Sequence, residues 1–147
     1  MTKLNDWLAV LEQRHPSAID LGLERVGVVA DRLHLREFSC PVITVAGTNG
    51  KGSTVATIVA IARAAGWRVA SYTSPHLVHF HERISCAGVL ITDTDLVAAL
   101  DAIDAVRADT SLTYFEHTTL AALWWFQRQN PDLIVLEVGL GGRLDAV

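Results

Sequence analysis

Residues 41–53 read PVITVAGTNGKGS, and this stretch decides the fold of the chain. Its first half, residues 41–46, is a short run rich in β-branched side chains, which predicts a buried strand. Its second half contains three glycines and a lysine, and residues 55–65 then follow the apolar spacing of a helix. A further strand is predicted at 68–73. The stretch therefore opens a strand–helix–strand unit, whose crossover should be right-handed.

The rest of the sequence predicts elements that complete an α/β fold. Apolar spacing indicates helices near 4–14, 23–33 and 115–128, and a fourth helix that Thr92 or Asp93 caps and that runs toward Val106. Residues 15–22 form a loop by composition, and residues 83–91 form a hairpin centred on Ala87 and Gly88. Residues 132–138 predict another strand of the parallel type, because their apolar run is continuous. We therefore expect a mostly parallel sheet flanked by helices.

Composition limits the classes of function. The 147 residues suit one domain, and 19% of them are charged, below the usual value of about 25%. The formal net charge is −4 and no run of Lys or Arg occurs, which argues against a nucleic-acid partner. No apolar run approaches the roughly 18 residues that span a bilayer, and no signal peptide is visible. Cys40 and Cys86 lie far apart in the sequence. We therefore expect a cytoplasmic protein without disulfides or membrane contacts.

The glycine-rich segment GTNGKGS at 47–53 is the strongest functional signal. Glycines let backbone N–H groups turn toward a phosphate chain, and the following helix adds positive potential at its N-terminus. Lys51 could neutralise the charge of the β and γ phosphates. The segment departs from the common P-loop pattern, because Gly52 follows Lys51 and the hydroxyl is displaced to Ser53. The alternative is a connector without a ligand, but a lysine among glycines at this junction favours phosphate binding.

Glu137 is the second signal, at the end of the predicted strand 132–138. Ligands of open α/β sheets bind at the carboxyl ends of the strands, so Glu137 and the loop 47–53 should face the same edge. A carboxylate there can hold Mg²⁺ that bridges the phosphates, and Ser74 could complete the metal shell. The alternative for Glu137 is an ion pair with Arg143.

Two further groups of residues leave alternatives open. The histidines at 76, 79 and 81 suggest zinc, but no cysteine or fourth ligand is suitably spaced. Tyr114 and Phe115 begin a predicted helix, and aromatic residues at helical spacing form the core more often than a ligand platform. Asp20 lies in a loop, where a carboxylate is usually solvated.

Several motifs together resemble those of the folylpolyglutamate synthase family, whose members are relatives of the Mur ligases. These motifs are VAGTNGKGST at 45–54, YTSPHL at 72–77, FHERI at 80–84, LTYFEHTTLAAL at 112–123 and LEVGLGGRLDA at 136–146. The stretch IDLGLERV at 19–26 looks like the pterin-side loop of the bifunctional bacterial members. Gly52 and Ser53 match the phosphate loop of that family. The resemblance implies an incomplete P-loop NTPase-like domain of the Mur ligase central-domain type.

The resemblance also implies roles for individual residues. The residues that would bind the ATP phosphates are Gly47, Thr48, Asn49, Gly50, Lys51, Gly52 and Ser53. Ser74 and Glu137 match magnesium ligands, and Lys51 and Glu137 would carry the catalysis. The residues that match the dihydropteroate-binding segments are Ile19, Asp20, Leu21, Thr113, Tyr114, Phe115, Glu116, Leu144, Asp145 and Ala146.

The implied function is ATP-dependent ligation in folate metabolism. Such an enzyme joins L-glutamate to dihydropteroate, and to the γ-carboxyl group of folates, through an acyl phosphate. It uses ATP and Mg²⁺, binds only small molecules and is a monomer when full-length. Residues 1–147 would be the N-terminal part of the ATP-binding ligase domain, without the C-terminal glutamate-ligase domain. The alternatives are a truncated, non-catalytic nucleotide- or pterin-binding module and another P-loop enzyme such as a small kinase.

Overall fold

The computed structural model describes residues 3–14 and 22–147, and its centre is a mixed sheet of five strands in the order β1-β5-β2-β3-β4. The strands are β1 (Val42–Val45), β2 (Val69–Tyr72), β3 (Ile84–Cys86), β4 (Val89–Leu90) and β5 (Leu133–Glu137). β1, β5 and β2 run parallel, whereas β3 and β4 form an antiparallel hairpin beside β2. The predicted parallel part is confirmed, and the hairpin extends it on one side.

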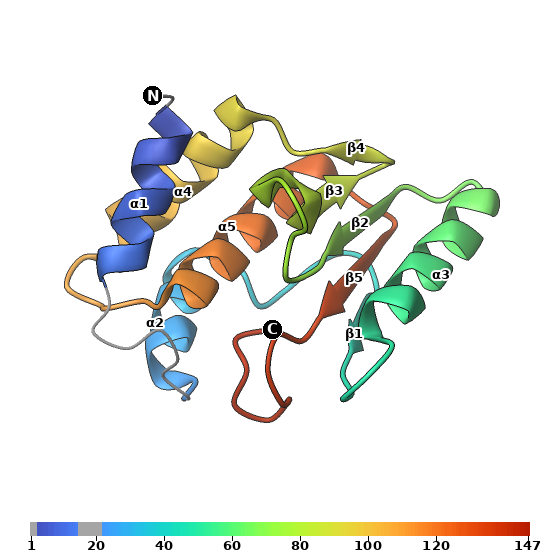
Figure 1. Cartoon of the computed structure of the whole chain (residues 1–147), viewed down its shortest axis with the longest axis horizontal. Helices are drawn as coiled ribbons and strands as arrows, with labels where there is room; N and C mark the ends of the chain where they lie inside the picture. Colours follow the sequence, from blue (N-terminus) through green and yellow to red (C-terminus); the bar gives the residue numbers. More distant parts are fainter. Residues whose placement is uncertain (1–2, 15–21) are drawn as a thin grey trace.

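The helices cover both faces of this sheet. They are α1 (Lys3–Arg14), α2 (Glu24–Arg32), α3 (Lys51–Ala64), α4 (Asp93–Arg107) and α5 (Tyr114–Gln129), with a short 3₁₀ helix, η1 (Phe80–Arg83). Figure 1 shows α3 on one side of the sheet and the other four α-helices on the opposite side. Across the described ranges, 3–14 and 22–147, no helix has the length and apolar character that crossing a bilayer requires. The predicted loop at 15–22 lies outside the described residues except for Gly22.

Two apolar cores hold the layers together. The smaller core joins Val55 of α3 to Leu133 and Val135 of β5. The larger core lies on the other face, where Phe126 of α5 packs with Ile134 of β5. All five residues of β5 are buried, because the alternating side chains of this central strand enter both cores. The continuous apolar run in the sequence correctly predicted this strand.

The prediction that residues 41–46 form a buried strand was wrong about burial. β1 forms where expected, but Val42 and Ile43 are 42% and 39% exposed. The reason is position: β1 is the terminal strand of the described sheet and pairs only with β5. An apolar sequence shows that a strand can be covered on both faces, but it does not show which neighbours do so.

Local signals in the sequence set several boundaries as predicted. The hydroxyl of Thr92 accepts a hydrogen bond of 3.1 Å from the backbone N–H of Asp95, so Thr92, not Asp93, caps α4. Ala87 and Gly88 have φ angles of +53° and +81°, the left-handed pair that a tight hairpin turn requires. The cap and the turn fix the start of α4 and the connection between β3 and β4.

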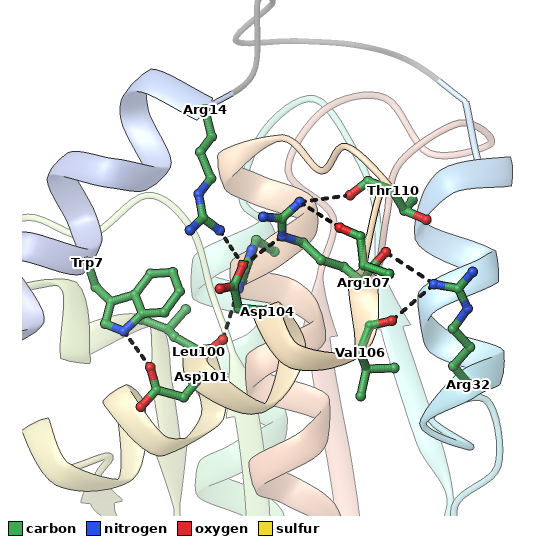
Figure 2. Close-up of polar contacts among 11 residues, drawn as sticks. Trp7, Arg14, Arg32, Leu100, Asp101, Asp104, Val106, Arg107 and Thr110 are labelled. Atoms are coloured by element: carbon green, nitrogen blue, oxygen red, sulfur yellow. Dashed lines mark hydrogen bonds and ion pairs between the residues drawn. The ribbon is translucent and has the colours of Figure 1, made fainter.

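Polar contacts join α1 and α2 to α4 (Figure 2). The guanidinium groups of Arg14 and Arg107 both contact Oδ1 of Asp104. Arg32 of α2 donates hydrogen bonds of 3.0 and 3.1 Å to the carbonyl oxygens of Val106 and Arg107. These arginines lie at the C-terminal end of α4, where a positive charge interacts favourably with the helix dipole.

Candidate functional site

The glycine-rich loop joins β1 to α3 as the sequence predicts. Gly50 is the N-cap of α3 and has a φ of +74°, a conformation in which a side chain would be strained. Lys51 is the first residue of α3, and its Nζ donates a hydrogen bond of 2.8 Å to the carbonyl oxygen of Gly47. The ammonium group therefore lies over the loop whose backbone amides the sequence assigns to phosphate.

Glu137 lies beside this loop because of the register of the parallel strands. Val45, the last residue of β1, is paired with Glu137, the last residue of β5. The ladder continues with a hydrogen bond of 3.0 Å from the N–H of Val138 to the carbonyl oxygen of Val45. In Figure 1 the loop after β5 and the loop before α3 lie at the same end of the sheet. The predicted meeting of the two segments is confirmed.

Ser74 also lies beside Glu137, because it follows β2, the second strand that pairs with β5. Its backbone N–H donates a hydrogen bond of 3.3 Å to Oε2 of Glu137. Glu137 is 6% exposed, and no ion pair within the described ranges joins it to Arg143, the alternative partner. A buried carboxylate with a serine beside it supplies the hard oxygen donors that a divalent cation prefers, so the residues present fit such an ion.

An aromatic group lies at the same edge of the sheet. The Phe115 ring stacks on that of Tyr72 with centroids 6.0 Å apart, and Tyr114 contacts Phe80 edge to face at 6.1 Å. Phe115 also lies over the backbone of Gly139, where an added Cβ would come within 2.7 Å of its Cζ atom. Phe115, at the start of α5, therefore contacts the segment that directly follows the carboxylate at the end of β5.

Arg83 belongs to this group, although the sequence analysis gave it no role. Its guanidinium carbon lies 5.3 Å from the Phe80 ring centroid and 5.7 Å from that of Tyr114. Its Nε donates a hydrogen bond of 2.9 Å to Nδ1 of His76, and burial together with this nearby positive charge lowers the pKa of His76. The structure brings Arg83 here because β3, which follows it, begins beside the end of β2.

The three histidines that suggested zinc have separate surroundings. His76 accepts from Arg83, His79 caps η1, and Nε2 of His81 lies 2.6 Å from Oδ1 of Asp93. Residues 79–81 enter a 3₁₀ helix, whereas a shared face for His79 and His81 would need a strand. In the part of the chain that the structure describes, no three His, Cys, Asp or Glu side chains are grouped to hold a metal.

Glu116 is buried at the start of α5 with both carboxylate oxygens engaged. Oε2 accepts a hydrogen bond of 3.0 Å from the backbone N–H of Thr113, and the Thr113 hydroxyl accepts one of 3.1 Å from the N–H of Glu116. This reciprocal pair is a capping box. Oε1 lies 2.6 Å from Nη2 of Arg25 in α2.

Hydrogen bonds within the segment after β5 also hold that segment in place. Asp145 is 7% exposed, and its carboxylate accepts hydrogen bonds of 2.7 and 3.0 Å from the backbone N–H groups of Leu140 and Val147. Leu144 is 47% exposed and Ala146 is half-buried beside α5. The remaining predicted substrate residues, Ile19, Asp20 and Leu21, lie outside the described residues.

Comparison with known proteins gives consistent relatives. No protein-family model matches the chain. The dihydrofolate synthase/folylpolyglutamate synthase of Escherichia coli (strain K12) is 50% identical over 143 residues, which are 97% of this chain and 34% of the relative. The protein of the same description from Haemophilus influenzae is 46% identical over 143 residues, 97% of this chain and 32% of the relative. The chain thus spans about a third of the length of these curated relatives.

Solved structures agree with the sequence relatives. E. coli FolC in complex with DHPP and ADP has a TM-score of 0.96 at 50% identity, covering 99% of this chain and 35% of that chain. The folylpolyglutamate synthase of Thermotoga maritima has a TM-score of 0.88 at 35% identity, covering 97% of this chain and 34% of that chain.

A strand that enters a glycine-rich loop, a helix that begins at a lysine and a buried carboxylate on the neighbouring strand of the sheet define an α/β domain with a P-loop-like strand–loop–helix unit. The sequence relatives and solved structures identify the family within this class. The chain is homologous to the N-terminal part of the dihydrofolate synthase/folylpolyglutamate synthases.

Proposed function

We propose that the native protein containing this chain is an ATP-dependent ligase that joins L-glutamate to dihydropteroate and to the γ-carboxyl group of folates. The observation that carries the proposal is the contact of Ser74 with Glu137 at the point where β1 enters the glycine-rich loop. Two solved relatives support it: E. coli FolC in complex with DHPP and ADP, and a bifunctional folylpolyglutamate synthase/dihydrofolate synthase with Mn, AMPPNP and L-glutamate bound.

The reaction proceeds in two transfers. A carboxylate oxygen of the pterin substrate attacks the γ-phosphorus of ATP and ADP leaves, which gives an acyl phosphate. The amine of L-glutamate then attacks the acyl carbon, an amide forms, and phosphate leaves with the lost proton passing to solvent. Because the first step brings two anions together, the site must mainly position the reactants and cancel charge.

The charge is cancelled at the edge that β1 and β5 share. The residues proposed to bind the ATP phosphates are the loop residues 47–53, with Lys51 exchanging its contact with the Gly47 carbonyl for the β and γ phosphates. Ser74 and Glu137 would hold a divalent cation, Mg²⁺ in the cell, which when bound neutralises phosphate charge. Lys51 and Glu137 are the residues that we assign to catalysis.

We assign the pterin to the side of the site that is formed by the first turn of α5. A flat ring system needs an apolar or aromatic wall, which Tyr114 and Phe115 supply. By the family resemblance, the other segments of this subsite are 19–21, Thr113, Glu116 and 144–146.

The setting that we propose for the enzyme rests on the family resemblance. Residues 1–147 correspond to the N-terminal part of an ATP-binding ligase domain, and the protein acts as a cytoplasmic monomer on small molecules. The net charge of −4 without a basic run supports the assignment of no nucleic-acid partner.

The test is ADP release by the native protein in a coupled assay. We expect release only when both dihydropteroate and L-glutamate are present. Lys51→Ala should lower turnover about a hundredfold or more, since it removes a charge that stabilises the transition state. Lys3→Ala is the matched control, because Lys3 is an exposed lysine paired with Asp101 on α4 and should leave turnover unchanged.

Other results would identify the alternatives. ADP release without L-glutamate would indicate a kinase, and nucleotide binding without release would indicate a non-catalytic module. Normal turnover of the Lys51→Ala variant would contradict the role of the glycine-rich loop.

A further inference from the structure

Glu116 makes one contact more than its place in the helix requires. At the third position of a capping box, a glutamine serves as well as a glutamate, because only an acceptor oxygen is needed for the Thr113 N–H. Here the other oxygen, Oε1, pairs with Nη2 of Arg25 at 2.6 Å, and the Glu116 side chain is 4% exposed. The negative charge of Glu116 therefore serves the contact with α2 as well as the helix N-terminus.

Among the described residues, Arg25 and Arg32 each make a directional contact from α2 to another helix. The buried residues of α2, Val26 and Val29 among them, lie in the larger core, and such apolar packing is not directional. Arg25 binds Glu116 near the start of α2, while Arg32 at the other end binds the carbonyl oxygens that end α4, as Figure 2 shows. The first contact is close to the candidate site, and the second is at the opposite end of α2.

The turn that Arg25 holds carries the aromatic wall. Tyr114 and Phe115 are the first two residues of α5, directly between Thr113 and Glu116. The Phe115 ring of this turn lies against the backbone of Gly139, two residues after Glu137. A shift of the turn would therefore move the wall relative to the carboxyl end of β5.

We propose that Arg25 is a positioning residue: through its ion pair with Glu116 it sets the aromatic wall for the pterin ring, without itself touching the substrate. This inference rests on the proposed ligase function and adds to it a residue that determines affinity on the pterin side. Without the ion pair, the first turn of α5 can relax away from α2. The protein then binds the substrate of this wall, dihydropteroate, more weakly. The ATP side is built on β1 and α3, whereas this ion pair joins α2 to α5.

The test measures Michaelis constants in the native protein. Glu116→Gln keeps the acceptor for Thr113 and removes the charge that holds Arg25, whereas Arg25→Met removes the partner. We expect each variant to raise the KM for dihydropteroate about tenfold while the KM for ATP changes less than twofold, since misplacement by about 1 Å can cost up to a hundredfold. The double variant should raise this KM by less than the product of the two single fold-changes, because both changes remove the same ion pair.

Two further variants keep the test decisive. Arg32→Met is the matched control. It removes the hydrogen bonds from α2 to the end of α4 and should leave the KM for dihydropteroate unchanged. Arg25→Lys keeps the positive charge, should raise this KM by threefold or less, and replaces Arg25→Met if that variant does not fold. An unchanged KM for dihydropteroate in the Arg25 and Glu116 variants, or an equal rise for ATP, would overturn the positioning role alone. Wild-type protein without dihydropteroate-dependent ADP release would overturn the proposed function itself.

Discussion

The backbone N–H of Ser74 donates a hydrogen bond to Oε2 of Glu137, although the two residues are 63 positions apart in the sequence. The contact follows from the register of the central strands: Tyr72 of β2 is paired with Leu136 of β5, so each of the two residues lies just beyond that pair. The Glu137 carboxylate is thereby placed between the turn after β2 and the loop after β1. Its position is a property of the sheet and not of a flexible loop.

We expect Glu137→Gln to fold normally but to lose activity. The amide oxygen of glutamine can still accept from the Ser74 N–H, so the melting temperature should change little. Turnover should fall about a hundredfold, because a neutral amide binds a divalent cation more weakly than a carboxylate does. A titration of activity with Mg²⁺ is the measurement. If the variant has the wild-type Mg²⁺ dependence, Glu137 is structural only.

We expect Gly139→Ala to disturb the aromatic wall. The new Cβ would lie 2.7 Å from Cζ of Phe115 and 3.1 Å from its neighbouring ring atoms, so the ring has to move. The free energy of unfolding should fall by about 1–3 kcal/mol, the usual cost of overpacking, and the KM for dihydropteroate should rise. Chemical denaturation and steady-state kinetics measure the two effects. Gly142→Ala is the control, since nothing lies within 4 Å of its added Cβ, and equal effects of both changes would contradict the clash.

We expect Glu82 to stabilise the fold at neutral pH and to lose this effect in acid. Its carboxylate accepts hydrogen bonds from the backbone N–H groups of His79, Leu77 and Val78, which lower the pKa of Glu82 to about 2. Because the folded pKa is below the unfolded value of 4.5, the contribution is present above pH 4.5 and disappears as the pH falls toward 2. The melting temperatures of Glu82→Gln and wild type should therefore differ at pH 7 and converge in acid. A difference that stays constant with pH would show that the charge is irrelevant.

His117 should destabilise the fold in mild acid. Burial lowers the pKa of His117 to about 4, and its Nε2 lies 3.2 Å from the carbonyl oxygen of Leu100. Between pH 6.5 and 4 the unfolded chain binds a proton that the folded protein excludes, so stability falls as the pH decreases through this range, by up to about 3 kcal/mol. Urea denaturation of His117→Gln, which keeps a donor for Leu100, should show a flatter pH dependence there. A slope equal to that of wild type would assign the acid sensitivity to other groups.

The sequence predicted the features that depend on neighbours along the chain. The strand before the loop 47–53, the helix after it and the hairpin turn at Ala87 and Gly88 all follow from periodicity and glycine placement, and all are confirmed. The parallel rule for α/β sheets also predicted that Glu137 would lie next to the glycine-rich loop.

The sequence did not predict contacts that depend on how the elements pack. Arg25 and Glu116 are 91 positions apart, and neither helix pattern indicates that one side chain will reach the other. Arg83 was missed because its importance comes from rings on η1 and α5 that only the tertiary structure brings around it. The exposure of β1 was mispredicted for the same reason: an apolar strand has the same sequence in the middle of a sheet and at its end.

β5 pairs with β1 through one edge and with β2 through the other, so a single strand sets both halves of the site. A slip of one residue along this ladder would move Glu137 by about 3.3 Å and turn its side chain to the opposite face of the sheet. The alignment of the glycine-rich loop with Ser74 would be lost in the same step. Accurate pairing of one buried strand during folding is therefore necessary to assemble the site.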